Sequence, residues 1–179
     1  MKRILLIVDP QNDFISGSLA VPEAEYKMRA LGKYLKENDY EFIAVTLDSH
    51  PKNHCSFKEN GGIWPKHCIK GTKGWKIPGY LYPILQNQLA NYYLKGQEKE
   101  EYSIFPGNEL LKEHILESNN YISIDICGIA GDYCVLETLK GLIEFVPKEK
   151  IRVLTQYVAS IDNGEKLNNF IKENNICSA

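Results

Sequence analysis

Residues 3–10 read RILLIVDP, an apolar run of strand length that ends abruptly at Asp9-Pro10. Such a run, bounded by a breaker, predicts a strand buried on both faces. Residues 23–37 follow with a helical pattern in which apolar side chains share one face. Residues 42–47 then repeat the buried-strand pattern. A strand, a helix and a second buried strand together predict a β-α-β unit with parallel strands.

The same alternation continues along the chain. Further strands are predicted at 91–95, 121–127 and 151–154, and further helices at 81–89, 109–117, 132–145 and 163–174. This order predicts an α/β protein with a mainly parallel sheet between two layers of helices. The 179 residues fit one domain, which we place at 1–179. The segment 48–79 is rich in Pro, Gly, His and Lys, and its length suggests a functional loop.

Composition narrows the class of partner. The chain has 21 Lys and Arg against 23 Asp and Glu, a formal net charge of −2. This balance gives no electrostatic reason to expect nucleic acid or an anionic membrane as a partner. The apolar run at 4–8 is too short for a signal peptide or a membrane span, so we expect a cytoplasmic protein. The odd number of cysteines, five, favours free thiols over a disulfide framework.

Polar residues follow four of the predicted strands. Asp9, Asp48 and Lys95 end three of them, and Cys134 lies in a turn that leads from a fourth into a helix. Ligands of open α/β sheets bind at the carboxyl ends of the strands. A thiol at a helix N-terminus near an ammonium is expected to have a lowered pKa, and a carboxylate could take its proton. Taken singly, Asp9 could shape a turn, Lys95 could be a solvated lysine and Cys134 could be inert packing.

Three of the four histidines lie in the long loop. Asp48, His50, His54 and His67 fall within 20 residues. One carboxylate with three imidazoles suits a divalent metal such as zinc, iron or manganese. Two alternatives stay open on spacing alone: a run of surface histidines, or ligation by the neighbouring thiolates of Cys55 and Cys68.

The chain resembles the nicotinamidases, within the isochorismatase-like cysteine hydrolases. The resemblance covers the chain from Ile4 to about Ala159. The motifs that carry it are residues 7–14 (IVDPQNDF), 17–22 (GSLAVP), 48–51 (DSHP), 54–57 (HCSF), 64–68 (WPKHC), 71–72 (GT), 95–96 (KG), 102–105 (YSIF) and 127–135 (CGIAGDYCV).

The resemblance implies roles for these residues and the three-layer fold of the isochorismatase-like hydrolases. The implied catalytic residues are Asp9, Lys95 and Cys134, and the implied metal ligands are Asp48, His50, His54 and His67. Phe14, Trp64 and Tyr102 are implied to hold the substrate ring. The amides of Ala130 and Cys134 are implied to bind the oxyanion, next to a cis peptide bond at Ile129–Ala130.

The resemblance further implies hydrolysis of nicotinamide to nicotinate and ammonia in NAD salvage, through a cysteine thioester. It implies one bound divalent ion, for which zinc is expected ahead of iron or manganese. It is also compatible with a homo-oligomer. Another amidase of the same fold and an inactive metal-binding protein are the rival hypotheses. The chain departs from the family at Lys66, often a proline, at Gly131, commonly a threonine, and at residues 156–159. These departures bear on the preferred amide and leave the candidate site residues intact.

Overall fold

The computed structural model describes residues 3–98, 101–105, 107–117 and 123–179. Within them, all pairs of neighbouring strands are parallel and form one sheet in the order β3-β2-β1-β4-β5-β6. The strands are β1 (Arg3–Val8), β2 (Phe42–Asp48), β3 (Asn91–Lys95), β4 (Ser123–Ile129), β5 (Ile151–Ala159) and β6 (Cys177–Ser178). The predicted parallel sheet is confirmed.

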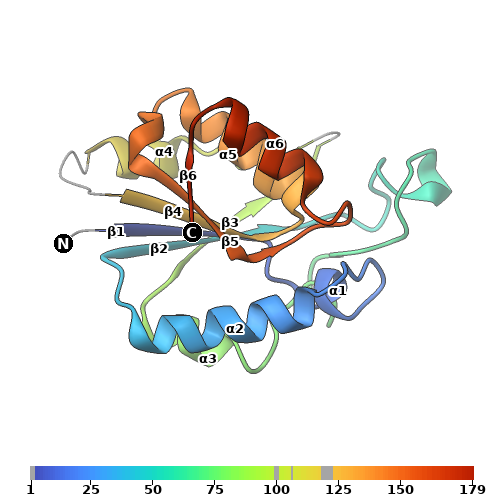
Figure 1. The fold of residues 1–179 in the computed structure, drawn as a ribbon. Coiled ribbons are helices and arrows are strands. Elements are labelled where there is room, and N and C mark those ends of the chain that lie inside the picture. Colours follow the sequence, from blue (N-terminus) through green and yellow to red (C-terminus); the bar gives the residue numbers. More distant parts are fainter. Residues whose placement is uncertain (1–2, 99–100, 106, 118–122) are drawn as a thin grey trace.

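Helices cover both faces of the sheet (Figure 1), which confirms the three-layer arrangement. In Figure 1, α2 and α3 lie below the sheet, and α4, α5 and α6 lie above it. The helices are α1 (Asn12–Ile15), α2 (Ala24–Glu37), α3 (Tyr82–Asn87), α4 (Glu109–Glu117), α5 (Leu136–Ile143) and α6 (Glu165–Glu173). Shorter helical turns are η1 (Lys58–Asn60), η2 (Gly131–Val135, a π-helical turn) and η3 (Lys148–Lys150).

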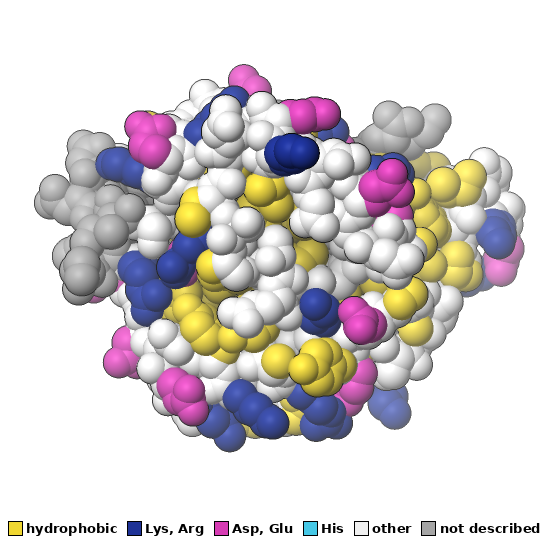
Figure 2. All heavy atoms as spheres, in the orientation of Figure 1, with side chains coloured by type: hydrophobic (Ala, Val, Ile, Leu, Met, Phe, Trp, Pro, Cys, Tyr) yellow, Lys and Arg dark blue, Asp and Glu magenta, His cyan; other side chains and the backbone are white. Residues whose placement is uncertain are grey.

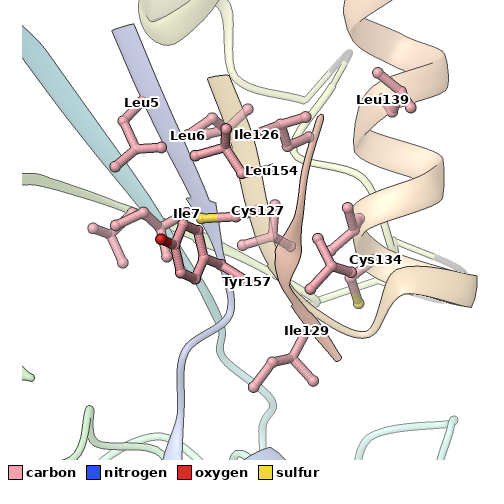
Figure 3. Close-up of a cluster of buried hydrophobic side chains, with 14 of the residues drawn as sticks. Leu5, Leu6, Ile7, Ile126, Cys127, Ile129, Cys134, Leu139, Leu154 and Tyr157 are labelled. Atoms are coloured by element: carbon pink, nitrogen blue, oxygen red, sulfur yellow. The ribbon is translucent and has the colours of Figure 1, made fainter. Parts of the chain in front are cut away.

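The central strand β1 is the middle of the core, because helices cover it on both sides. Its residues 4–8 are at most 1% exposed. Figure 3 shows Leu6 and Ile7 beside Ile126 and Cys127 of β4, with Leu139 of α5 to their right. Outside the core, Lys and Arg side chains are interspersed with Asp and Glu over the face drawn in Figure 2. Within the described residues, no helix combines the length and apolar character needed to cross a membrane.

Several elements differ from the predicted ones. β4 continues past 127 to Ile129, and Gly128 pairs with Val8 although glycine in an apolar run indicated a turn. β5 continues to Ala159: its polar residues 155 and 156, half-buried and exposed, lie where the pairing with β4 shifts register, and they interrupt the apolar pattern without ending the strand. The two-residue β6 and the short α1 were not predicted. The first two residues of the predicted strand at 121–127 lie outside the described residues.

The order of the strands defines where a ligand binds. β1 is followed in the chain by β2 on one side, while β4 lies on its other side, so the connections diverge between β1 and β4. In open α/β sheets, the crevice at this switch point holds the ligand. The residues that follow β1 and β4 therefore face the candidate site.

Candidate active site and metal centre

Asp9, Lys95 and Cys134 come together at the carboxyl end of the sheet. Lys95 Nζ lies 2.7 Å from Asp9 Oδ2 and 3.4 Å from Cys134 Sγ. Lys95 ends the edge strand β3, and its side chain reaches past β2 to the end of β1. Cys134 lies in η2, directly after β4. Three distant segments thus supply a thiol, a carboxylate and an ammonium in mutual contact.

A threonine of β2 fixes the Asp9 carboxyl group. Thr46 Oγ1 donates a hydrogen bond to Asp9 Oδ1 at 2.6 Å, while Lys95 pairs with the other oxygen. The backbone N–H of Asp9 also donates to the carbonyl of Thr46, at 3.1 Å. Both carboxyl oxygens are therefore held, in a residue that is fully buried.

Burial dominates the ionisation of these groups. It raises the pKa of the Asp9 carboxyl above its usual value, although the Lys95 ammonium opposes the rise. Burial disfavours the Lys95 ammonium, but Asp48 and Asp9 prevail and hold the pKa of Lys95 well above its usual value. Burial also raises the pKa of Cys134 well above its usual value, more than Lys95 lowers it. The expectation of a lowered pKa for Cys134 is therefore wrong, and the raised pKa favours the neutral thiol.

Asp48, His50 and His67 form a second cluster, and their ligand atoms lie within 4.8 Å of one another. Asp48 Oδ2 is 3.0 Å from His50 Nε2 and 3.7 Å from His67 Nε2, and the two Nε2 atoms are 3.2 Å apart. All three residues are buried. Of the predicted ligands, these three converge on one point.

The donor atoms of this cluster fit a cation. His67 Nδ1 lies 2.8 Å from the Pro65 carbonyl, and His50 Nδ1 lies against the Gly96 carbonyl. A carbonyl can only accept, so each Nδ1 carries the hydrogen and each Nε2 presents a lone pair. Two lone pairs and a carboxylate oxygen that face one another repel unless a positive charge lies between them. This arrangement is typical of a divalent metal site with nitrogen and oxygen ligands.

His54 lies beside the cluster. Its ring stacks on that of His50 with centroids 4.1 Å apart, and its Nε2 is 3.2 Å from the Glu98 carbonyl. Its Nδ1 lies 2.7 Å from Ser56 Oγ. His54 therefore contacts the predicted metal site through its ring, while both of its nitrogens face other groups.

The two cysteines of the rival arrangement lie outside the cluster. Among the described residues, the group that could hold a metal contains no thiol. Cys55 is exposed, and burial raises the pKa of Cys68 well above its usual value. A thiol whose pKa is raised by burial is a poor source of the thiolate that metals bind.

Asp48 joins the two clusters. Its Oδ1 is 3.2 Å from Lys95 Nζ, and its Oδ2 faces the histidines. Burial disfavours the Asp48 carboxylate, but the Lys95 ammonium prevails and holds the pKa of Asp48 well below its usual value. Gly96 makes this approach possible, because its φ is +78° and an added Cβ would lie 2.1 Å from Asp48 Oδ1.

Both clusters open on one small cavity of about 30 Å³. Its walls carry the predicted ring-binding residues together with groups from each cluster: Phe14, Trp64, Tyr102, Asp48, His67, Ala130 and Cys134. Trp64 Nε1 donates a hydrogen bond to Tyr102 Oη at 3.2 Å. The cavity thus places a thiol, ligand atoms of the metal cluster and aromatic rings around one space.

Ala130 and Cys134 bracket the start of the catalytic turn. The peptide bond Ile129–Ala130 is cis, as the resemblance implied. Ala130 and Cys134 both line the cavity. N–H groups in the first turn of a helix lack partners within that helix, so they are suited to bind a developing oxyanion.

Two departures from the family pattern have local explanations. Lys66 pairs with Glu59 at 2.5 Å on the surface, which directs its charge away from the metal cluster. At Gly131, an added Cβ would lie 2.0 Å from Ser160 Oγ, so the serine side chain occupies the space that a larger residue would need.

The sequence interpretation missed some residues of this site. Thr46 bonds the Asp9 carboxyl, and Tyr133 and Ile161 line the cavity. A signal existed for Thr46, since it lies two residues before Asp48 and alternate strand residues share a face. Ile161 follows β5, and nothing in its local sequence marks it.

Comparisons with known proteins identify the family and the fold. The family model described as the isochorismatase domain matches residues 3–144. The nicotinamidase/pyrazinamidase of Mycobacterium tuberculosis is 35% identical over 150 residues, 79% of this chain and 78% of the relative. A crystal structure of the Pyrococcus horikoshii pyrazinamidase in complex with zinc is 32% identical with a TM-score of 0.81, covering 100% of this chain and 99% of the other. The yeast nicotinamidase bound to the inhibitor nicotinaldehyde is 28% identical with a TM-score of 0.84, covering 99% of both chains.

Proposed function

The chain belongs to the isochorismatase family, and we propose that it is a nicotinamidase that hydrolyses nicotinamide to nicotinate and ammonia. Nicotinate can be returned to NAD, so the reaction belongs to NAD salvage. The observation that carries the proposal is the single cavity onto which the Cys134 thiol, the Asp48–His67 cluster and three aromatic rings open. Purified protein that releases ammonia from nicotinamide, and loses this activity with a chelator, would support it.

In the proposed mechanism, Phe14, Trp64 and Tyr102 enclose the pyridine ring and exclude water from the thiol. The amide carbon then lies against Cys134 Sγ. Holding a substrate in the geometry of attack removes much of the entropic part of the barrier.

The first half of the reaction forms a thioester. Asp9 takes the proton of the Cys134 thiol, and sulfur attacks the amide carbon. The amides of Ala130 and Cys134 bind the oxyanion. Asp9 then gives its proton to the leaving nitrogen, the C–N bond breaks, and ammonia departs. Lys95 contacts both Asp9 and Cys134, so its charge stabilises each anion as it forms.

The second half releases the acid. Asp9, again ionised, takes a proton from a water molecule, which attacks the thioester carbon. The C–S bond breaks, nicotinate leaves, and the proton returns to Cys134. The same carboxylate thus acts as base and acid in both halves.

We propose that the divalent metal is zinc, held by Asp48, His50 and His67, with His54 beside them. Support comes from the nitrogen and oxygen donor set and from the zinc in the related Pyrococcus horikoshii pyrazinamidase.

A comparison of two amides tests whether the metal contacts the ring nitrogen of the substrate. Benzamide has the carboxamide and ring size of nicotinamide but lacks the ring nitrogen. A nitrogen–metal contact of about 3 kcal/mol gives roughly a hundredfold preference in kcat/KM for nicotinamide, since 1.4 kcal/mol is a factor of ten. We expect His50→Ala to collapse this preference by slowing nicotinamide far more than benzamide. Equal losses for both amides would mean that the metal acts on water instead.

The raised pKa of Asp9 predicts the acid limb of the pH profile. Asp9 must be ionised to act as base, so kcat/KM should fall as the pH drops through the pKa of Asp9, which lies above the usual aspartate value. Lys95 lowers this pKa, so Lys95→Met should move the acid limb to higher pH, whereas the surface variant Lys112→Met should leave it in place. An acid limb that stays fixed or moves down in Lys95→Met contradicts the assignment of Asp9 as base.

A further inference from the structure

The turn after β1 contains three polar side chains that the reaction does not use. Gln11, Asn12 and Asp13 each form a hydrogen bond with a segment between residues 48 and 76, the loop that carries the metal ligands. Building on the proposed function, we propose that Gln11 and Asp13 are positioning residues that hold the backbone of Asp48, His50 and His67 in the geometry of a metal site.

Gln11 extends the pairing between β1 and β2 by one more residue. Strand pairing ends at Ile7 and Val45, and the side-chain amide of Gln11 then satisfies both backbone groups of Asp48. Its Oε1 accepts from the Asp48 N–H and its Nε2 donates to the Asp48 carbonyl, each at 2.8 Å. Nε2 also donates to the Trp75 carbonyl at 2.8 Å. Two hydrogen bonds from this fully buried side chain thus hold the backbone of Asp48, and the third ties it to Trp75.

Asp13 holds the backbone next to the two histidines in the same way. Its Oδ2 accepts from the N–H of Cys68 at 2.7 Å, and Cys68 adjoins His67. The Cys68 carbonyl in turn accepts from the N–H of His50 at 3.0 Å. The Asp13 carboxylate therefore holds the strand segment through which the backbones of both histidines are connected.

The Asp13 carboxylate packs tightly against Gly74. An added Cβ at Gly74 would lie 2.0 Å from Asp13 Oδ2, so only glycine leaves room for the carboxylate. The N–H of Asp13 also donates to the Gly74 carbonyl at 2.9 Å. Both the side chain and the backbone of Asp13 are therefore fastened to the loop, which leaves the ligand-bearing segment little freedom to shift.

Position matters because a metal site tolerates little displacement. Ligand atoms must stay within about 0.5 Å of the productive geometry, and loss of a supporting partner typically weakens metal binding by about 10–100-fold. The backbones of Asp48, His50 and His67 are held by Gln11 and Asp13, so removing either support should weaken binding without touching a ligand.

The test is the zinc affinity of the full chain, measured by competition with a chromogenic chelator. Gln11→Met keeps the length and the neutral charge of the side chain but removes all three hydrogen bonds. A change in zinc affinity therefore reports the position of the ligands and not a change in charge. We expect about 10–100-fold weaker zinc binding in Gln11→Met and in Asp13→Asn. Asn12→Ala is the matched control, because within the described residues the Asn12 side chain bonds only the exposed Lys73 carbonyl, and the zinc affinity of this variant should equal that of the wild type.

A second readout separates positioning from general damage. The rate at which iodoacetamide alkylates Cys134, followed on its peptide, should be unchanged in Asp13→Asn, because the contacts of Asp9 and Lys95 with the thiol do not involve Asp13 or the Cys68 N–H that it holds. Wild-type zinc affinity in Gln11→Met and Asp13→Asn overturns the inference, and so does an equal loss in Asn12→Ala. Zinc affinity is measured without any amide, so failure of the nicotinamidase proposal would be a separate result.

Discussion

Cys134→Ala is expected to abolish hydrolysis of nicotinamide, because thioester formation requires sulfur at this position. Removal of a triad nucleophile lowers kcat by as much as about 10⁶-fold. The side chain is small and packs at the cavity wall, so the fold and the zinc content of the variant should be those of the wild type. Steady-state ammonia release and metal analysis on the same preparation measure both.

The other cysteines provide controls for this variant. Cys127 is also buried, but it lies within β4 and does not line the cavity, so Cys127→Ala should retain turnover. Cys55 is exposed, and Cys55→Ala should behave in the same way. Turnover that survives in Cys134→Ala but is lost in Cys55→Ala or Cys68→Ala would move the nucleophile to the metal loop.

Asp9→Asn is expected to lower the rate of chemistry by at least about 10²–10⁴-fold, the usual contribution of general acid–base catalysis. The substitution keeps the shape of the side chain and removes the base. Because the pKa of Cys134 is raised by burial, the thiol does not ionise by itself at neutral pH, and the variant lacks the carboxylate proposed to accept its proton. Single-turnover measurements report this step directly.

Thr46 offers a matched comparison for Asp9. Thr46→Val removes the hydrogen bond to Asp9 Oδ1 but leaves the base and its ion pair with Lys95 in place. Its loss of rate should be much smaller than that of Asp9→Asn. Near-normal turnover in Asp9→Asn at neutral pH would reduce Asp9 to a residue that shapes the turn after β1.

The raised pKa of Cys134 changes how the site operates. The helix terminus and Lys95 favour a thiolate, and the sequence showed both. The structure adds complete burial and two neighbouring carboxyl groups, which disfavour it more strongly. In the proposed mechanism, the thiolate therefore forms only when Asp9 accepts the proton of Cys134, so attack by sulfur requires an ionised Asp9.

The sequence by itself determined the α/β architecture and most members of both clusters; His54, predicted as a metal ligand, lies beside the metal cluster. Buried parallel strands appear as continuous apolar runs, and the polar residue that ends each run must lie at the same edge of the sheet. Asp9, Asp48 and Lys95 could be assigned to one site for this reason. The resemblance assigned specific roles to Cys134 and to the histidines.

Only the tertiary structure decided how these groups interact. Gln11, Thr46 and Asp13 bond residues 37 to 55 positions away, and such contacts depend on strand register and loop path, which local sequence patterns do not contain. Burial of Cys134 likewise sums contributions from several elements, so its effect on the pKa could not be judged from neighbours in the chain. The sequence therefore supplied the chemical groups, and packing decided their protonation and their supports.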